Sequence, residues 1–166
     1  MSDRDSIWLG CNALVFAAQG GNSEVVQLLI EAGASPKCEA TDGTSPLSLA
    51  VEHRSSRLVE ILLKANAPLP KDILVTSVWN SSNEVTLLLI EAGAKVNACN
   101  ELGQSVLHRA AEMGRLDLVQ ALVRSKANLN QKANGTIPLL VAIENKQVGC
   151  ALELIQAGAD PSATDS

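Results

Sequence analysis

The polar and apolar positions of this chain follow a helical period that recurs along the sequence. Within residues 101–130, an apolar helical face begins just after Ser105 and stops at Gly114. Serine is a good helix N-cap and glycine commonly ends a helix, so a short first helix is predicted here. A second helix is predicted directly after it, with Leu116, Leu118, Val119, Leu122 and Val123 at helical spacing. One helix pair cannot bury this second face, so neighbours are expected.

The same helix pair is predicted five times. An alanine in the first helix is followed seventeen residues later by an alanine after the second, with one serine substitution, in the pairs Ala17/Ala34, Ala50/Ala67, Ser77/Ala94, Ala110/Ala127 and Ala142/Ala159. Leucines stand in register in every copy: Leu14, Leu47, Leu74, Leu107 and Leu139 in the first helices, and Leu29, Leu62, Leu89, Leu122 and Leu154 in the second. Steps of 33, 27, 33 and 32 residues indicate a solenoid of stacked helix pairs. We expect one domain, 1–166, with units 7–39, 40–70, 71–99, 100–131 and 132–163.

Two of the five copies depart from the others. In the third, the Pro-Leu-Pro link from Ala67 to Asp72 is about six residues short, and Ser77 and Thr86 replace apolar residues, so this layer is expected to be the weakest of the stack. The fifth carries Glu153 at a position that is apolar elsewhere, which favours an outer cap with a polar face. Alternatively, residues 160–165 lead into a further turn of the stack.

Two stretches carry a family resemblance. Asp42 to Ala50 (DGTSPLSLA) and Leu102 to Ala111 (LGQSVLHRAA) are similar to the G-x-T-P-L-H-x-A signature of ankyrin repeats, and Gly33-Ala34, Gly93-Ala94 and Gly158-Ala159 match the start of their G-A-D-V-N ending. The resemblance covers roughly residues 7–163. It implies an all-α ankyrin-repeat solenoid of about five helix-turn-helix units with short β-turn fingers. The short link predicts that one finger is missing between units two and three.

The resemblance also implies roles for single residues. The imidazole of His108 is expected to bond the hydroxyl of the Ser105 cap and nearby backbone, whereas His53 ends a first helix and is expected to be solvated. Asn97 and Asn130 fit loosely the asparagines that are hydroxylated in ankyrin turns. Their alternative role is that of turn-forming asparagines that bond their own backbone.

Composition limits the classes of function. The net charge of −5 argues against a nucleic-acid or anionic-membrane surface, because both require an excess of lysine and arginine. No apolar run is long enough to cross a bilayer and the first nine residues do not resemble a signal peptide, so a soluble cytoplasmic or nuclear protein is expected. The four cysteines show no zinc-binding spacing, and Cys150 is expected in the core.

No catalytic motif is present in the sequence. It contains no G-x-S-x-G, no phosphate-binding loop and no H-E-x-x-H, so nothing assembles a nucleophile, a base and an orienting group. We therefore expect a protein that is not an enzyme and that binds no metal or cofactor.

The resemblance places partner contacts at the turn tips and on the solvent side of each first helix. The residues expected there include Trp8, Asp42, Thr44, Glu52, His53, Trp79, Asn80, Glu101, Leu102, Glu112, Met113, Glu144 and Asn145. This surface holds both tryptophans and five carboxylates, and no lysine or arginine is expected on it. It predicts a monomeric protein-interaction module, a scaffold, adaptor or inhibitor, whose acidic groove binds a basic protein segment with an apolar anchor.

The two tryptophans leave alternatives open. Trp79 is expected to be the binding centre, flanked by Glu52 and Glu112, but it could instead fill space beside Ser77. The runner-up function is binding of a small ligand or nucleotide with Trp79 as a stacking platform, and a third is an inert spacer. Trp8 is either a groove contact or a lid over the first helix.

Overall fold

The computed structural model describes residues 13–40, 42–80 and 82–162. Trp8, expected either as a groove contact or as a lid over the first helix, lies outside the described residues. The chain divides into two compact units, one ending at Ile73 and the other beginning at Leu74. The expectation of one continuous repeat domain remains a prediction.

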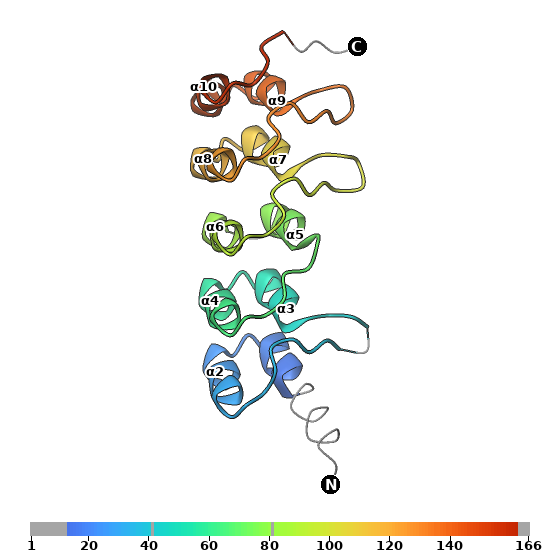
Figure 1. The fold of residues 1–166 in the computed structure, drawn as a ribbon, viewed down its shortest axis with the longest axis vertical. Helices are drawn as coiled ribbons and strands as arrows, with labels where there is room; N and C mark the ends of the chain where they lie inside the picture. Colours follow the sequence, from blue (N-terminus) through green and yellow to red (C-terminus); the bar gives the residue numbers. More distant parts are fainter. Residues whose placement is uncertain (1–12, 41, 81, 163–166) are drawn as a thin grey trace. The chain divides into compact units, whose positions relative to one another are not determined.

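The first unit contains two helix pairs. Its helices are residues 13–19, α2 (Ser23–Glu31), α3 (Pro46–Glu52) and α4 (Ser56–Lys64). Helix α4 packs against both α3 and α2 (Figure 1). The starts of α2, α3 and α4 are fixed by side-chain caps, because Asn22, Ser45 and Ser55 each accept a hydrogen bond from a backbone N–H of the first turn.

The second unit repeats this arrangement three times. Its helices are α5 (Ile73–Asn80, of which the first residue belongs to the first unit), α6 (Asn83–Glu91), α7 (Val106–Glu112), α8 (Leu116–Arg124), α9 (Pro138–Glu144) and α10 (Val148–Gln156). The second helices α6, α8 and α10 follow one another in one layer, and α7 packs on α9 in the other (Figure 1). Ile137 precedes α9 without a side-chain cap bond.

The leucines in register form the core. Nine of the ten are fully buried, at 0% or 1% exposure, and only Leu29 is half-buried. Burying a leucine side chain stabilises a fold by roughly 1.5 to 3 kcal/mol, so this row accounts for a large part of the apolar stabilisation. The repeat register read from the sequence is therefore the register of the core.

Three of the connections form short fingers. Ala40 N–H donates to the Thr44 carbonyl at 2.8 Å, and isolated antiparallel bridges join Cys99 to Ser105 and Ala133 to Thr136. The tip of the last finger places both Asn134 and Gly135 at positive φ, 51° and 85°, the pattern of a two-residue hairpin turn. No strand is present among the described residues.

The fourth connection, residues 65–72, has no such finger. It runs from the end of α4 to the start of α5 and contains no bridge (Figure 1). Its first three residues, 65–67, donate backbone hydrogen bonds back to α4, and near its end the Ile73 N–H donates to the Pro70 carbonyl at 3.3 Å. The missing finger predicted from the short link is confirmed. Two prolines in this link remove backbone donors, which explains why it does not pair.

The polar residues of the third helix pair are buried and bonded. The Ser77 hydroxyl donates to the Leu74 carbonyl at 2.8 Å, and the Thr86 hydroxyl donates to the Ser82 carbonyl at 3.3 Å. Both side chains are fully buried, at 0% exposure. Because each hydroxyl has a partner in its own helix, neither carries the full cost of an unpaired buried group. That this layer is the weakest remains a prediction.

The expected polar outer face of the last helix pair is wrong. Glu153 instead accepts a hydrogen bond from Gln120 on α8 at 3.0 Å, so it lies at the contact between α8 and α10. The face left open by α9 and α10 is apolar, with Ile143, Val148, Leu152 and Ile155 between 49% and 68% exposed. The sequence argument placed Glu153 on the wrong side of its helix.

Candidate functional site

In the first unit the expected contact residues lie on the finger and on α3. Asp42 is exposed at the finger tip, where its carboxylate accepts the Thr44 N–H at 2.9 Å. This bond stabilises the carboxylate and holds the pKa of the Asp42 carboxyl below its ordinary value. Glu52, on the last turn of α3, is also exposed.

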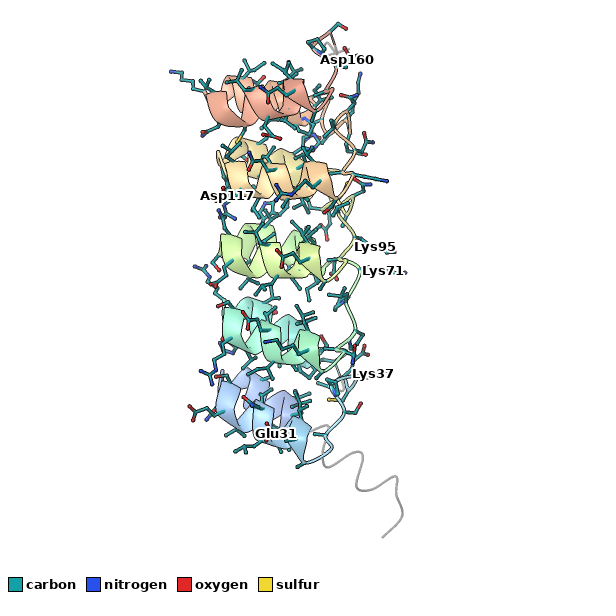
Figure 2. All side chains as sticks on the ribbon, turned by 60° about the vertical axis from the view of Figure 1, so that its left-hand side comes forward. Glu31, Lys37, Lys71, Lys95, Asp117 and Asp160 are labelled. Atoms are coloured by element: carbon teal, nitrogen blue, oxygen red, sulfur yellow. The ribbon has the colours of Figure 1, made fainter. Side chains whose placement is uncertain are left out.

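A cleft of about 460 Å³ opens beside these residues. One wall is the finger, from Asp42 to Thr44, and another is the link from Pro68 to Asp72. Ser45, Ser48 and Glu52 of the α3 region also line it. Lys71 lies on the outer edge of this link (Figure 2). Sequence reasoning located the absent finger but did not predict the cleft beside it.

His53 is exposed but is not simply solvated, as had been expected. Its Nε2 lies 2.7 Å from the Gln19 carbonyl oxygen, so the ring ties the end of α3 to the end of the preceding first helix. The bond spans 34 residues, and the repeat register could have indicated it, because Gln19 and His53 both end first helices. His53 therefore has a structural role in addition to its place on the candidate surface.

In the second unit the environment of Trp79 differs from the expected one. The Arg109 guanidinium carbon lies 5.7 Å from the centre of the Trp79 ring, and Arg109 Nη1 bonds the Glu112 carboxylate at 2.9 Å. Arg115 donates to the Val78 carbonyl at 3.3 Å. Burial, together with the nearby charge of Arg109, lowers the pKa of Arg115 from its ordinary value. Trp79 is half-buried, and the expectation that no arginine borders this surface is wrong.

Arg109 could have been found from the sequence. It lies three residues before Glu112, a spacing that places the two side chains on one helix face, where opposite charges pair. The flanking of Trp79 by Glu52 remains a prediction, since the two residues belong to different units.

The other expected contact residues of the second unit are exposed. Leu102 on the finger is 65% exposed and Met113 at the end of α7 is 40% exposed. Asn80, Glu101, Glu144 and Asn145 are exposed as well, and the Asn145 amide donates to the Val141 carbonyl at 2.9 Å. The fingers and first helices of the second unit therefore present both apolar and acidic side chains to solvent.

His108 has the structural role that was expected. Its Nδ1 accepts the Ser105 backbone N–H at 3.2 Å and lies 2.8 Å from the Ser105 hydroxyl, so Nε2 carries the proton and donates to the Thr136 carbonyl at 3.2 Å. His108 is 2% exposed, and burial lowers the pKa of its imidazole. A neutral, fully bonded ring of this kind joins helix α7 to the finger that precedes α9.

Asn97 and Asn130 bond the next turn rather than their own. The Asn97 side-chain oxygen accepts the Asn128 N–H at 2.8 Å, and that of Asn130 accepts the Asp160 N–H at 2.9 Å. Asp160 lies in the last described turn (Figure 2). Both asparagines are exposed, and their hydroxylation remains a prediction. The two bonds connect successive repeats of the second unit.

Among the described residues, no group of three or more histidine, cysteine, aspartate or glutamate side chains could hold a metal ion. Cys150 is 1% exposed, which confirms its place in the core, and burial raises the pKa of its thiol. In the same residues, no helix combines the length and the hydropathy that crossing a bilayer requires.

Comparison with known proteins identifies the repeat. The family model for ankyrin repeats, in three copies, matches residues 2–72 and 74–165. The B-cell lymphoma 3 protein of Homo sapiens is 34% identical over 83% of this chain, and its homologue in Mus musculus is 32% identical over 82%. The chain spans about a third, 33%, of the length of each.

A solved structure shows the same fold. The ankyrin repeat domain of Bcl-3, described as a unique member of the IkappaB protein family, is 32% identical to this chain with a TM-score of 0.73. The match covers 90% of this chain and 71% of that domain. The predicted all-α ankyrin fold is thereby confirmed, and the chain belongs to the ankyrin repeat family.

Proposed function

We propose that this chain is a non-catalytic protein-interaction module that binds a segment of another protein on its fingers and first helices. Ankyrin repeats typically present their variable surface residues to partner proteins, and function depends on that surface rather than on the fold. The contact residues are those expected from the sequence. They are Trp79, Asn80, Glu52, His53, Asp42, Thr44, Leu102, Glu101, Glu112, Met113, Glu144, Asn145 and Trp8.

The observation that carries the proposal is the exposure of large apolar side chains beside carboxylates. Leu102 and Met113 are 65% and 40% exposed, and Glu101 adjoins Leu102 on the finger. Exposed apolar residues within a polar rim are typical of binding surfaces. Glu112 contributes less negative charge than expected, because Arg109 pairs with it.

The partner segment that this surface fits is basic and carries an apolar anchor. Asp42, Glu52, Glu101 and Glu144 are exposed and provide the negative charge. A monomer acting in the cytoplasm or nucleus is part of the same proposal. The stacking-platform alternative is less favoured, because the Arg109 guanidinium already lies over the Trp79 ring.

Capture from cell lysate tests the proposal. The wild type is compared with Leu102→Ser/Met113→Ser, which alters the proposed surface, and with Leu28→Ser/Ile155→Ser, which alters exposed apolar residues on two second helices. The wild type and Leu28→Ser/Ile155→Ser should capture the same proteins, and Leu102→Ser/Met113→Ser should fail to capture them. Circular dichroism melts confirm that both variants fold. Equal capture by all three proteins would contradict the proposed surface.

A further inference from the structure

The cleft in the first unit exists because a finger is missing. The link from Pro68 to Asp72 runs directly into α5, whereas the preceding connection projects a finger that includes Asp42 to Thr44. The space between the two is open and has a volume of about 460 Å³, within the roughly 300 to 1,000 Å³ that is usual for ligand-binding pockets. It is therefore large enough for side chains of a bound segment.

The charge in this cleft is strongly negative. Four carboxyl groups line it against a single amino group: Glu39, Asp42, Glu52 and Asp72, against Lys71. Asp42, Glu52 and Asp72 are exposed, and the Asp42 carboxylate accepts the Thr44 N–H at 2.9 Å. A ligand that complements this charge is cationic.

The remaining walls distinguish one cation from another. Pro68, Leu69 and Pro70 supply an apolar strip along the link, and Leu69 and Pro70 are half-buried. The hydroxyls of Ser45 and Ser48 are 3.0 Å apart and bond each other, so they are already partly satisfied. An arginine side chain fits such walls, because its aliphatic stem packs on apolar surface and its planar head bonds carboxylates in a bidentate manner.

We infer that this cleft is the docking site for an arginine of an extended partner segment, with the stem on the Pro68 to Pro70 strip and the guanidinium among Asp42, Glu52 and Asp72. The inference rests on the proposed function and specifies where its basic segment docks. The other basic residues of such a segment are attracted to the acidic surface only at long range. This attraction raises the association rate more than it raises the affinity of the complex.

Labelled peptides test the cleft directly. The probe is a fluorescein-labelled Gly/Ser octapeptide with two arginines, and its matched control carries citrulline, which has nearly the same shape without the charge. Fluorescence anisotropy at low salt should show the arginine peptide binding at least tenfold more tightly than the citrulline peptide. A lysine peptide should bind between the two. Equal binding of the arginine and citrulline peptides would overturn the inference.

Two neutralising variants locate the binding. Glu52→Gln/Asp72→Asn retains the shape of the cleft. It should lower the affinity for the arginine peptide at least tenfold, which corresponds to about 1.4 kcal/mol of binding free energy. The matched control is Glu91→Gln/Asp117→Asn, which removes two exposed carboxylates from second helices of the second unit, outside the proposed contact surface, and should change the affinity less than twofold. If both variants weaken binding equally, the peptide responds to net charge alone and the cleft is not the site.

The same variants separate this inference from the proposed function. A partner captured from lysate should bind Glu52→Gln/Asp72→Asn at least tenfold more weakly than the wild type. If Glu52→Gln/Asp72→Asn captures the partner as well as the wild type does but Leu102→Ser/Met113→Ser does not, the cleft is not the docking site and the proposed interaction surface stands. If the arginine peptide binds as expected while no protein depends on Leu102 and Met113, the proposed surface fails and the cleft remains a peptide site.

Discussion

The guanidinium of Arg109 lies over the ring of Trp79, with 5.7 Å between the guanidinium carbon and the ring centre, and is held there by the Glu112 carboxylate at 2.9 Å. Arg109 and Glu112 come from α7, whereas Trp79 comes from α5, so the three side chains join two successive first helices. A stacked cation of this kind orders a half-exposed tryptophan before any partner arrives. Such ordering reduces the entropy lost on binding.

Replacing Trp79 tests whether it anchors a partner. Trp79→Ala should move the thermal midpoint by only a few degrees, because a cation–π pair near the surface contributes about 0.5 to 1 kcal/mol. Binding of the partner captured from lysate should weaken at least tenfold, roughly 1.4 kcal/mol. Calorimetry on the purified pair measures the affinity. Unfolding of the variant, or undiminished partner binding, would show that the ring only fills space.

His108 makes stability depend on pH. Burial lowers the pKa of the folded imidazole below its ordinary value of 6.5, so the unfolded chain binds more protons than the folded protein below that pH. The free energy of unfolding should therefore fall as the pH drops through 6.5 toward the folded pKa. A protonated Nδ1 can no longer accept a hydrogen bond, so the bond from the Ser105 N–H would also be lost. Urea melts at a series of pH values measure the slope.

A glutamine at this position is the matched variant. Glutamine is a usual partner at the third position of a capping box, so His108→Gln should keep a bond to the Ser105 N–H while removing the titration. The loss of stability below pH 6.5 should become smaller in His108→Gln than in the wild type. If His108→Gln shows the wild-type slope, other groups cause the acid dependence.

Asn97 should protect an amide in the next repeat. Its side-chain oxygen accepts the Asn128 N–H at 2.8 Å, so Asn97→Ala should speed hydrogen exchange at the Asn128 amide. The free energy of unfolding should fall by at most about 0.5 to 1.5 kcal/mol, because water can replace the lost partner in this exposed turn. Asn97→Asp keeps an acceptor and should preserve most of the protection. Exchange at Asp160, whose N–H bonds Asn130, is the internal reference. Equal acceleration at both amides would indicate general loosening rather than loss of one bond.

The repeat register could be read from the sequence because spacing alone determines it. Leu47, Leu107 and Leu139 recur at fixed distances from the alanine markers, and each is buried where the register places it. The Ser45 and Ser105 caps were also predictable, because a serine before an apolar run has few other roles there. The missing finger followed from chain length, since a short link cannot leave the stack and return.

Side-chain partners across repeats were harder to predict. Glu153 was expected to face solvent but bonds Gln120, and Arg109 was left off the candidate surface although it covers Trp79. Helical spacing shows which residues share a face, but it does not determine which rotamer a long charged side chain adopts. The identity of the candidate surface is therefore better predicted than its local charge.

The open face of the last helix pair gives a final prediction. Leu152 is 54% exposed and lines a shallow apolar hollow of about 200 Å³ with Ile143, Val148 and Ile155. Replacing an exposed side chain removes little buried surface, so Leu152→Glu should change the free energy of unfolding by no more than about 0.5 kcal/mol. Leu154→Ala, at a fully buried neighbour, should cost about 2 to 5 kcal/mol. Urea titration compares the two, and a large loss in Leu152→Glu would mean that this face is covered in solution.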